Sequence, residues 1–411
     1  MFHVPDRAGG HPRTVIAVLA VALLGLSGWA GYHLMGRVLP KVDQAEAAEV
    51  APPKPPVVVV EALPQVDERL AREGEAGRFM GAVLVARGDE VLFRQVYGKA
   101  DYEADRPMAL DTPFRLASIS KQFTGVALLK LQDEGKLQMS DPVCRWIQPC
   151  PDAWAPLTLS HLVSHTSGIP DLMARPAWGL RRVTPATLDE LTADSAQYRL
   201  AFEPGTKVRY NNAGFNLAAA VIERASGMSY EAYLQTALFD PIGMTRTGLG
   251  DASDGAMGYA NFPGGLTPQP NANVSIVIGA GALYSTLDDM LAWSRALHGG
   301  EILSSASYQQ FLADHAPDDT PSERGRPRRD YGFGIFTNRL GQRVNPQFHE
   351  SQIYHTGSWS GFRNLMTYQP DAEVTVIVLS NNYHSREQVF LISQQAMAEA
   401  LGHDFPAAGR E

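Results

Sequence analysis

The sequence has few cysteines and no excess of positive charge. Two cysteines in 411 residues are too few for a disulfide-scaffolded miniprotein or a four-cysteine zinc site. The 35 lysines and arginines are outnumbered by 44 aspartates and glutamates, so the formal net charge is −9 and no basic field attracts a phosphate backbone. We therefore expect no nucleic-acid partner. With 45% hydrophobic residues, the chain is instead long enough for a body with a sizeable core.

Several common functional motifs are also absent. No G-x-S-x-G occurs, which excludes an α/β-hydrolase nucleophile elbow, and neither G-x-x-x-x-G-K-S/T nor G-x-G-x-x-G occurs, which excludes phosphate-cradling loops. His161 and His165 are four residues apart on an expected helix, but Leu162 stands where a zinc-binding H-E-x-x-H motif requires glutamate. Packing or capping is the favoured interpretation of these histidines. We expect no metal and no cofactor.

The N-terminal part differs in residue composition from the rest of the chain. Residues 14–36 contain no aspartate, glutamate, lysine or arginine, and as a helix they would span ~34 Å, enough for a hydrocarbon core of ~30 Å. Arg7 and Arg13 precede this segment and favour a cytoplasmic N-terminus. We therefore expect residues 1–36 to form a cytoplasmic tail and a single-pass inner-membrane anchor, with the body in the periplasm; a cleaved signal peptide is the alternative. Residues 37–61, rich in proline and alanine, predict a linker.

Strand-like and helical segments follow a clear order in the remaining chain. Apolar, β-branched runs occur near both ends, whereas apolar residues at helical spacing dominate the middle. The expected strands are residues 81–87, 91–97, 331–336, 352–356, 363–368 and 374–379, and the expected helices are residues 118–134, 159–165, 213–226, 230–239, 287–297 and 386–401. This order predicts a two-lobed α/β (α+β) body over residues 62–411. Its sheet lobe would combine residues 62–117 and 331–411, with an all-helical lobe over residues 118–330 inserted between them.

A candidate nucleophile lies where the first strand-rich segment gives way to a helix. Ser118-Ile119-Ser120-Lys121 has the pattern S-x-x-K, and a spacing of three residues on a helix puts the serine and the lysine on one face. A serine hydroxyl is a poor nucleophile until a base removes its proton, and a desolvated lysine is a competent base. The segment is therefore a candidate for covalent catalysis.

Two further motifs follow in the sequence. Tyr210-Asn211-Asn212 precedes an expected helix, and His355-Thr356-Gly357 closes an expected strand. Each motif alone is weak, but all three in this order would arise by chance with a likelihood near ~0.001. Together they resemble the serine β-lactamase and DD-peptidase (penicillin-recognising) superfamily in its class C-like branch, over roughly residues 64–401. The resemblance implies a β-lactamase/transpeptidase-like fold with an antiparallel sheet.

The resemblance also implies roles for individual residues. Ser118 would be the acylated nucleophile, Lys121 its base, and Tyr210 the group that passes a proton to the leaving group; whether Lys121 or Tyr210 is the acylating base stays open. Two backbone N–H groups, those of Ser118 and Ser358, would form the oxyanion hole. The expected substrate-binding residues are Asn212, His355, Thr356, Gly357 and Ser358.

His355 bears on the choice of substrate. Class C β-lactamases of this pattern carry lysine at that position, whereas histidine is only fractionally charged at neutral pH and binds a carboxylate less strongly. The expected function is a serine hydrolase that acts through an acyl-enzyme on a small-molecule or peptide acyl substrate: a D-Ala-D-Ala-type peptide, an ester or a β-lactam. Carboxypeptidase or esterase activity is favoured over efficient β-lactamase activity. A non-catalytic penicillin-binding sensor or scaffold is the alternative.

The two cysteines lie close together in the sequence. Cys144 and Cys150 bracket a short loop that contains a proline. An oxidising compartment favours a disulfide between them, and two buried thiols are the alternative.

Overall fold

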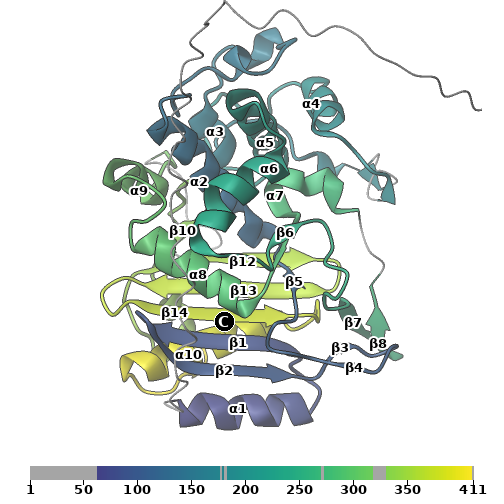
Figure 1. The fold of residues 1–411 in the computed structure, drawn as a ribbon, viewed down its shortest axis with the longest axis vertical. Coiled ribbons are helices and arrows are strands. Elements are labelled where there is room, and N and C mark those ends of the chain that lie inside the picture. The colour runs from purple at the N-terminus through teal and green to yellow at the C-terminus, as the bar shows by residue number, and fades with distance from the viewer. Residues whose placement is uncertain (1–62, 176–177, 180–182, 270–272, 318–329, 410–411) are drawn as a thin grey trace, which may run out of the picture. The chain divides into compact units, whose positions relative to one another are not determined.

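Strands from both ends of the described chain form one six-stranded antiparallel sheet (Figure 1). The computed structural model describes residues 63–175, 178–179, 183–269, 273–317 and 330–409. The strand order is β10-β12-β13-β14-β1-β2. The strands are β1 (Gly81–Arg87), β2 (Glu90–Tyr97), β10 (Phe336–Asn338), β12 (Gln352–Trp359), β13 (Phe362–Gln369) and β14 (Val374–Ser380). Because Gly81 of β1 pairs with Ser380 of β14, the last long strand joins the first one in the centre of the sheet.

Successive residues of the central strands enter two different hydrophobic cores. Val376 and Val378 of β14 belong to the core shared with α1 (Pro64–Glu75) and α10 (Arg386–Leu401). Ile377, between them, belongs to the larger core shared with the helices of the opposite face. Side chains alternate between the two faces of a strand, and here both faces are covered. This explains why β1 and β14 are continuous apolar runs rather than alternating ones.

The central helix of the inserted region is α2 (Ser120–Asp133), which packs against α5, α7 and α9. Its residues 120–129 are all buried, which is the pattern of a helix surrounded by protein on every side. The other helices of this region are α3 (Leu159–Val163), α4 (Leu188–Ala196), α5 (Ala213–Ser226), α6 (Tyr230–Leu234), α7 (Ile278–Gly281), α8 (Leu287–His298) and α9 (Ser305–Leu312). Lys121 of the candidate S-x-x-K pair therefore lies in the first turn of a core helix, and Ser118 lies just before that helix.

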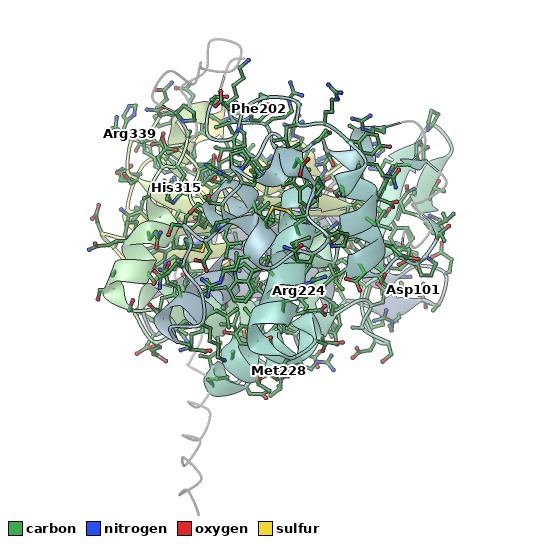
Figure 2. All side chains as sticks on the ribbon, turned by 90° about the horizontal axis from the view of Figure 1, so that it is seen from above. Asp101, Phe202, Arg224, Met228, His315 and Arg339 are labelled. Atoms are coloured by element: carbon green, nitrogen blue, oxygen red, sulfur yellow. A yellow bond between two sulfur atoms is a disulfide. The ribbon has the colours of Figure 1, made fainter. Side chains whose placement is uncertain are left out.

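Helix α5 has one buried end and one exposed end. Its residues 213–222 are buried, whereas Arg224 and, just beyond the helix, Met228 are exposed (Figure 2). Gly227 ends the helix in the left-handed conformation, with φ 74°, which glycine adopts without a steric penalty. The loop that carries Tyr210 leads directly into the buried N-terminal end of this helix, while Tyr210 itself is exposed.

The predicted two-lobed fold class is confirmed, and the inserted region also contains short strands. These are β6 (Gly248–Leu249), β7 (Tyr259–Phe262), β8 (Gly265–Pro268) and β9 (Leu283–Ser285); the remaining short strands are β3 (Lys99–Asp101), β4 (Arg106–Pro107), β5 (Phe114–Arg115), β11 (Val344–Asn345) and β15 (Ala407–Ala408). The strand predicted over residues 331–336 is misplaced, since β10 begins only at Phe336. Gly334, with φ 91°, turns the chain before it can extend.

The predicted single-pass location in the inner membrane is contradicted. Within the described ranges, no helix is long and apolar enough to cross a membrane. The longest described helix, α10, has 16 residues and spans roughly 24 Å, less than a hydrocarbon core of ~30 Å. The predicted anchor over residues 14–36 and the linker over residues 37–61 lie outside the described residues.

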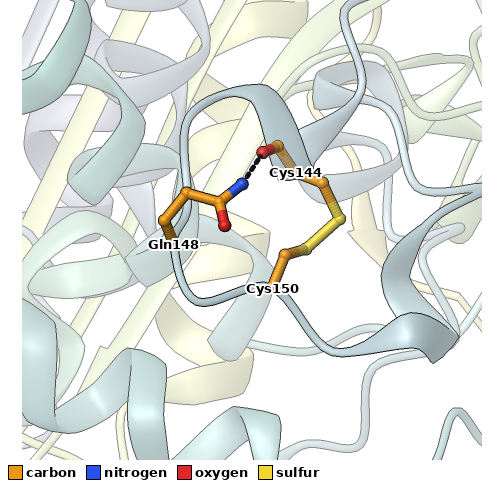
Figure 3. Close-up of a disulfide and its surroundings, with 3 residues drawn as sticks. All are labelled: Cys144, Gln148 and Cys150. Carbon is orange, nitrogen blue, oxygen red and sulfur yellow. Dashed lines mark hydrogen bonds between the residues drawn. A yellow bond between two sulfur atoms is a disulfide. The ribbon is translucent and has the colours of Figure 1, made fainter.

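Cys144 and Cys150 form a disulfide across a short loop (Figure 3). Their Cα atoms are 5.3 Å apart, within the usual range for a disulfide. Both residues are half-buried and pack against the larger core, and the side-chain amide of Gln148 donates to the carbonyl oxygen of Cys144 inside the loop. The disulfide thus closes a short loop within the inserted region.

Replacing both cysteines by serine should lower the free energy of unfolding by about 2 kcal/mol, because the cross-link restricts the unfolded chain over a short loop. Urea unfolding of the wild type and of the Cys144→Ser/Cys150→Ser variant, without reductant, measures the difference. Dithiothreitol should then bring the wild-type midpoint down to that of the variant and leave the variant unchanged. Equal midpoints for the oxidised wild type and the variant would contradict this prediction.

Candidate active site

Ser118 lies in a 3-10 turn, Ala117–Ile119, that leads directly into α2. Ala117 and Ile119 are buried, whereas Ser118 is half-buried and lines a cavity of about 370 Å³. Ala117 has φ 51°, a left-handed conformation that is strained for a residue with a Cβ atom. The turn therefore presents the Ser118 hydroxyl to the cavity while its neighbours anchor it in the core.

The amine of Lys121 is buried within reach of this hydroxyl. Its Nζ atom lies 3.2 Å from Ser118 Oγ, and it donates to Asn212 Oδ1 and to the carbonyl oxygen of Ala280, both at 2.8 Å. Burial lowers the pKa of Lys121 to about 7, against a smaller opposing effect of the Asp171 carboxylate. A large fraction of the amine is therefore neutral near pH 7 and able to take a proton.

The two asparagines of the Tyr-Asn-Asn segment have different tasks. Asn211 Oδ1 accepts a hydrogen bond from the backbone N–H of Gly214 in the first turn of α5. Asn212, at the N-cap position, makes no side-chain capping bond; its Oδ1 accepts from Lys121, and its Nδ2 lies 3.3 Å from Met173 Sδ. Because Asn211 satisfies the helix end, Asn212 can hold the lysine.

Tyr210 lies over the amine of Lys121. The Nζ atom is 4.9 Å from the centre of the Tyr210 ring, and the ring lines the same cavity as Ser118. The side chain is 41% exposed, so its hydroxyl-bearing ring reaches the solvent side of the site. The structure thus brings together Ser118, Lys121 and Tyr210, which come from two distant segments of the chain.

Strand β12 forms the opposite wall of the cavity. Thr356 and Ser358 line it, and Gly357 lets the strand approach the turn that carries Ser118. A Cβ atom at Gly357 would lie 2.1 Å from the carbonyl oxygen of Leu116, a distance that no side chain tolerates. Glycine at this position is therefore a steric requirement for placing the wall next to the serine.

His355 is buried rather than directed at an open binding surface. It is 1% exposed; its Nδ1 donates to the carbonyl oxygen of Thr356 at 2.7 Å, and its Nε2 lies 3.3 Å from the Tyr331 hydroxyl. A carbonyl can only accept, so Nδ1 carries the proton, and in the neutral ring Nε2 accepts from Tyr331. His355 lines the cavity, but protein groups occupy both of its ring nitrogens.

Several residues at the site were missed by the sequence analysis. Ala280 contributes only its backbone carbonyl, for which a sequence has no side-chain signal. Asp171 stands in no motif that the sequence pointed to. Burial raises its pKa, while hydrogen bonds from Met173 and Asn212 and the charge of Lys121 oppose that rise. The other missed lining residues, mostly apolar, are Met173, Val277, Gly281, Phe336 and Trp359.

Comparisons with known proteins identify the family of this chain. A model of the Beta-lactamase family matches residues 66–398. A penicillin-binding protein of Bacillus subtilis is 29% identical over 350 residues, covering 80% of this chain and 73% of that protein. The esterase EstB of Burkholderia gladioli is 36% identical over 300 residues, covering 63% of this chain and 75% of that protein.

A solved structure shares the fold. The octameric penicillin-binding protein homologue from Pyrococcus abyssi aligns with a TM-score of 0.70 and 24% identity, covering 83% of this chain and 77% of that one. These matches support a serine hydrolase of the β-lactamase and penicillin-binding superfamily. The chain belongs to the β-lactamase family, whose model spans most of its described residues.

The close approach at Gly357 generates a prediction. Gly357→Ala should lower the free energy of unfolding by about 1–3 kcal/mol, because the new methyl group forces β12 away from a backbone oxygen. The same displacement should slow the labelling of Ser118 by a fluorophosphonate probe. Thermal unfolding and labelling rates measure both effects. Gly264→Ala is the control, since a Cβ atom there meets nothing within 4 Å. Indistinguishable behaviour of the two variants would refute the steric argument.

Proposed function

We propose that the protein is a serine hydrolase that forms an acyl-enzyme on Ser118. The observation that carries this proposal is the buried amine of Lys121, which lies 3.2 Å from Ser118 Oγ and has a pKa of about 7. A base with a pKa near the working pH combines a substantial neutral fraction with useful proton affinity. Ser118 lines a cavity of about 370 Å³, large enough for a small acyl substrate, and Lys121 lies behind it in the protein interior.

In the proposed reaction, neutral Lys121 takes the proton of Ser118 while Oγ attacks the carbonyl carbon of the substrate. The electron pair of the carbonyl moves to its oxygen, which the backbone N–H groups of Ser118 and Ser358 stabilise. The bond to the leaving group then breaks, and Tyr210 delivers a proton to that group and regains one from Lys121. A water molecule then attacks the carbonyl carbon of the acyl-enzyme and gives up a proton to the same basic groups. The bond to Ser118 Oγ breaks, Oγ regains a proton, and the acid product leaves. The direct contact between Lys121 and Ser118 favours Lys121 as the acylating base.

For the substrate, we propose a small ester or amide without an obligatory carboxylate. Most of the cavity lining is apolar, and among the described lining residues no arginine or lysine is present. Both ring nitrogens of His355 form hydrogen bonds with protein groups, so this side chain is poorly placed to bind a carboxylate. Esterase or peptidase activity is therefore favoured over efficient β-lactamase activity. Asn212 and Thr356 are the proposed hydrogen-bonding partners of the substrate.

We further propose that the hydrolase body spans residues 62–411 with the site between two lobes. The sheet lobe would comprise residues 62–117 and 331–411, and the helical lobe residues 118–330. Support comes from the cavity, whose wall on one side is β12 of the large sheet and on the other the N-terminal ends of α2 and α5.

Ser118→Ala should abolish both covalent labelling by a fluorophosphonate probe and hydrolysis of a p-nitrophenyl ester, because no other atom there can form the acyl-enzyme. Labelling and turnover of wild-type and variant protein measure this. Persistent labelling of the wild type without turnover would indicate a sensor, and no labelling of folded wild type a scaffold. Hydrolysis retained in pure Ser118→Ala protein would place the nucleophile elsewhere. We expect the wild type to turn over the ester faster than a cephalosporin.

Activity should depend on pH through Lys121. The amine must be neutral to act as a base, so kcat/KM should fall about tenfold per pH unit below its pKa of about 7. The Asp171 carboxylate favours the charged amine, so Asp171→Asn should lower that pKa and move the acidic limb to lower pH. The pH profile of kcat/KM for a neutral ester measures both. A profile that is flat from pH 8 to 5 would rule out Lys121 as the base.

A further inference from the structure

His165 has an unusual backbone conformation next to the site. It lies two residues beyond α3, is 1% exposed, and has φ 63°, in the left-handed region. A non-glycine residue in this region carries strain that the surrounding contacts must offset, and such residues gather at functional sites. Ala117, the neighbour of Ser118, is another residue with a positive φ angle.

The contacts of His165 bracket Tyr210. The backbone N–H of Arg209 donates to the carbonyl oxygen of His165 at 2.9 Å, and the backbone N–H of Asn211 lies 3.3 Å from His165 Nδ1. The imidazole ring itself lies 4.2 Å from the Tyr210 ring, measured between ring centres. One histidine thus holds the residue before Tyr210, the residue after it, and the Tyr210 ring.

The imidazole must be neutral to make these contacts. An N–H group donates to Nδ1, so that atom carries a lone pair and the proton is on Nε2. Burial holds the pKa of His165 well below its ordinary value, as does repulsion from Lys121 and from His355 when they are charged. Within the described part of the chain, Nε2 has no hydrogen-bond partner. A phenylalanine ring at this position would avoid the cost of burying an unpaired N–H group. The presence of histidine instead points to its Nδ1 atom, which accepts the hydrogen bond from Asn211.

Two further aromatic rings contact the imidazole of His165. Tyr331 lies 4.6 Å from His165 between ring centres, and its hydroxyl bonds His355 of β12. Phe215 of α5 contacts the ring at 5.2 Å. The imidazole of His165 is therefore packed against three aromatic rings, one of which is that of Tyr210.

We propose that His165 is a positioning residue that holds Tyr210 over the Lys121 amine for proton delivery to the leaving group. The inference rests on the proposed function. Tyr210 precedes its helix in a loop and is 41% exposed, so its own burial constrains it little. A displacement of ~1 Å in a catalytic group can cost a hundredfold in rate.

The decisive variants differ at Nδ1. His165→Phe keeps a ring but loses the acceptor, and we expect kcat to fall about a hundredfold with little change in KM. His165→Asn keeps an oxygen near the position of Nδ1, and asparagine tolerates a positive φ angle, so it should restore most of kcat. If His165→Phe does not fold, His165→Gly replaces it, because glycine accepts the backbone conformation and likewise lacks the acceptor. Thermal unfolding verifies each variant.

His161 offers a matched control. Its Nδ1 accepts the backbone N–H of Thr158 at 3.1 Å, the same kind of contact, but it serves the N-terminus of α3 and does not line the cavity. His161→Phe should therefore lower stability while leaving kcat at the wild-type level. A loss of kcat equal to that of His165→Phe would overturn the proposal, as would a failure of His165→Asn to restore kcat.

A double-variant cycle shows whether His165 acts through Tyr210. Tyr210→Phe combined with His165→Phe should be no slower than Tyr210→Phe alone, because a positioning residue has nothing left to position. The loss in His165→Phe should also be larger for an ethyl ester than for a p-nitrophenyl ester, whose leaving group needs no proton. The proposal would be refuted if the rate loss of the double variant equalled the product of the two single-variant losses. It would also be refuted if His165→Phe slowed the hydrolysis of both esters equally.

The outcomes separate this inference from the proposed function. Wild-type protein that neither labels at Ser118 nor hydrolyses either ester overturns both. Wild-type hydrolysis that depends on Ser118, together with independent effects of the two substitutions, overturns the role of His165 alone.

Discussion

The amine of Lys121 is removed from water, and the rest of the site depends on that constraint. An ammonium group in the interior is costly unless protein groups replace its hydration, and burial shifts the balance toward the neutral base. Ser118, Asn212 and Ala280 supply the three partners from three separate segments. The lysine can be buried only because α2 is a core helix, covered by protein along its first turns. The same burial that costs stability thus makes the base available near neutral pH.

The sheet topology decides what faces this base. Since β1 pairs with β14, the N-terminal and C-terminal parts of the body share one sheet, and β12 comes to lie against the turn that carries Ser118. The two backbones touch where Gly357 meets Leu116. A cavity wall is thereby set at a fixed distance from the nucleophile. The substrate site therefore depends on the order of the strands in the sheet as well as on the residues that line the cavity.

Two histidines at the site are buried and form hydrogen bonds with protein groups. His355 bonds Tyr331 and its own neighbour, and His165 bonds the backbone on either side of Tyr210. The Nδ1 atom of His165 accepts an N–H group, so this ring is neutral, whereas Nδ1 of His355 donates to the carbonyl oxygen of Thr356. This accounts for a cavity with little fixed positive charge in its described lining, and for the preference for neutral acyl substrates that we propose.

The sequence by itself determined the order of the long strands, the two-lobed class and the three motifs, because these depend on periodicity and residue type along short segments. It predicted the helices α2, α3, α5, α6, α8 and α10 but not α1, α4, α7 and α9. It misplaced the strand near residue 331, where glycines break the local pattern, and its inner-membrane location is contradicted. It also assigned His355 to substrate binding and gave His165 no chemical role. Only the tertiary structure shows the contacts that His355 and His165 make, and the proximity of Ala280 and Asp171 to Lys121. Their roles arise from contacts between segments far apart in the chain, to which local spacing carries no information.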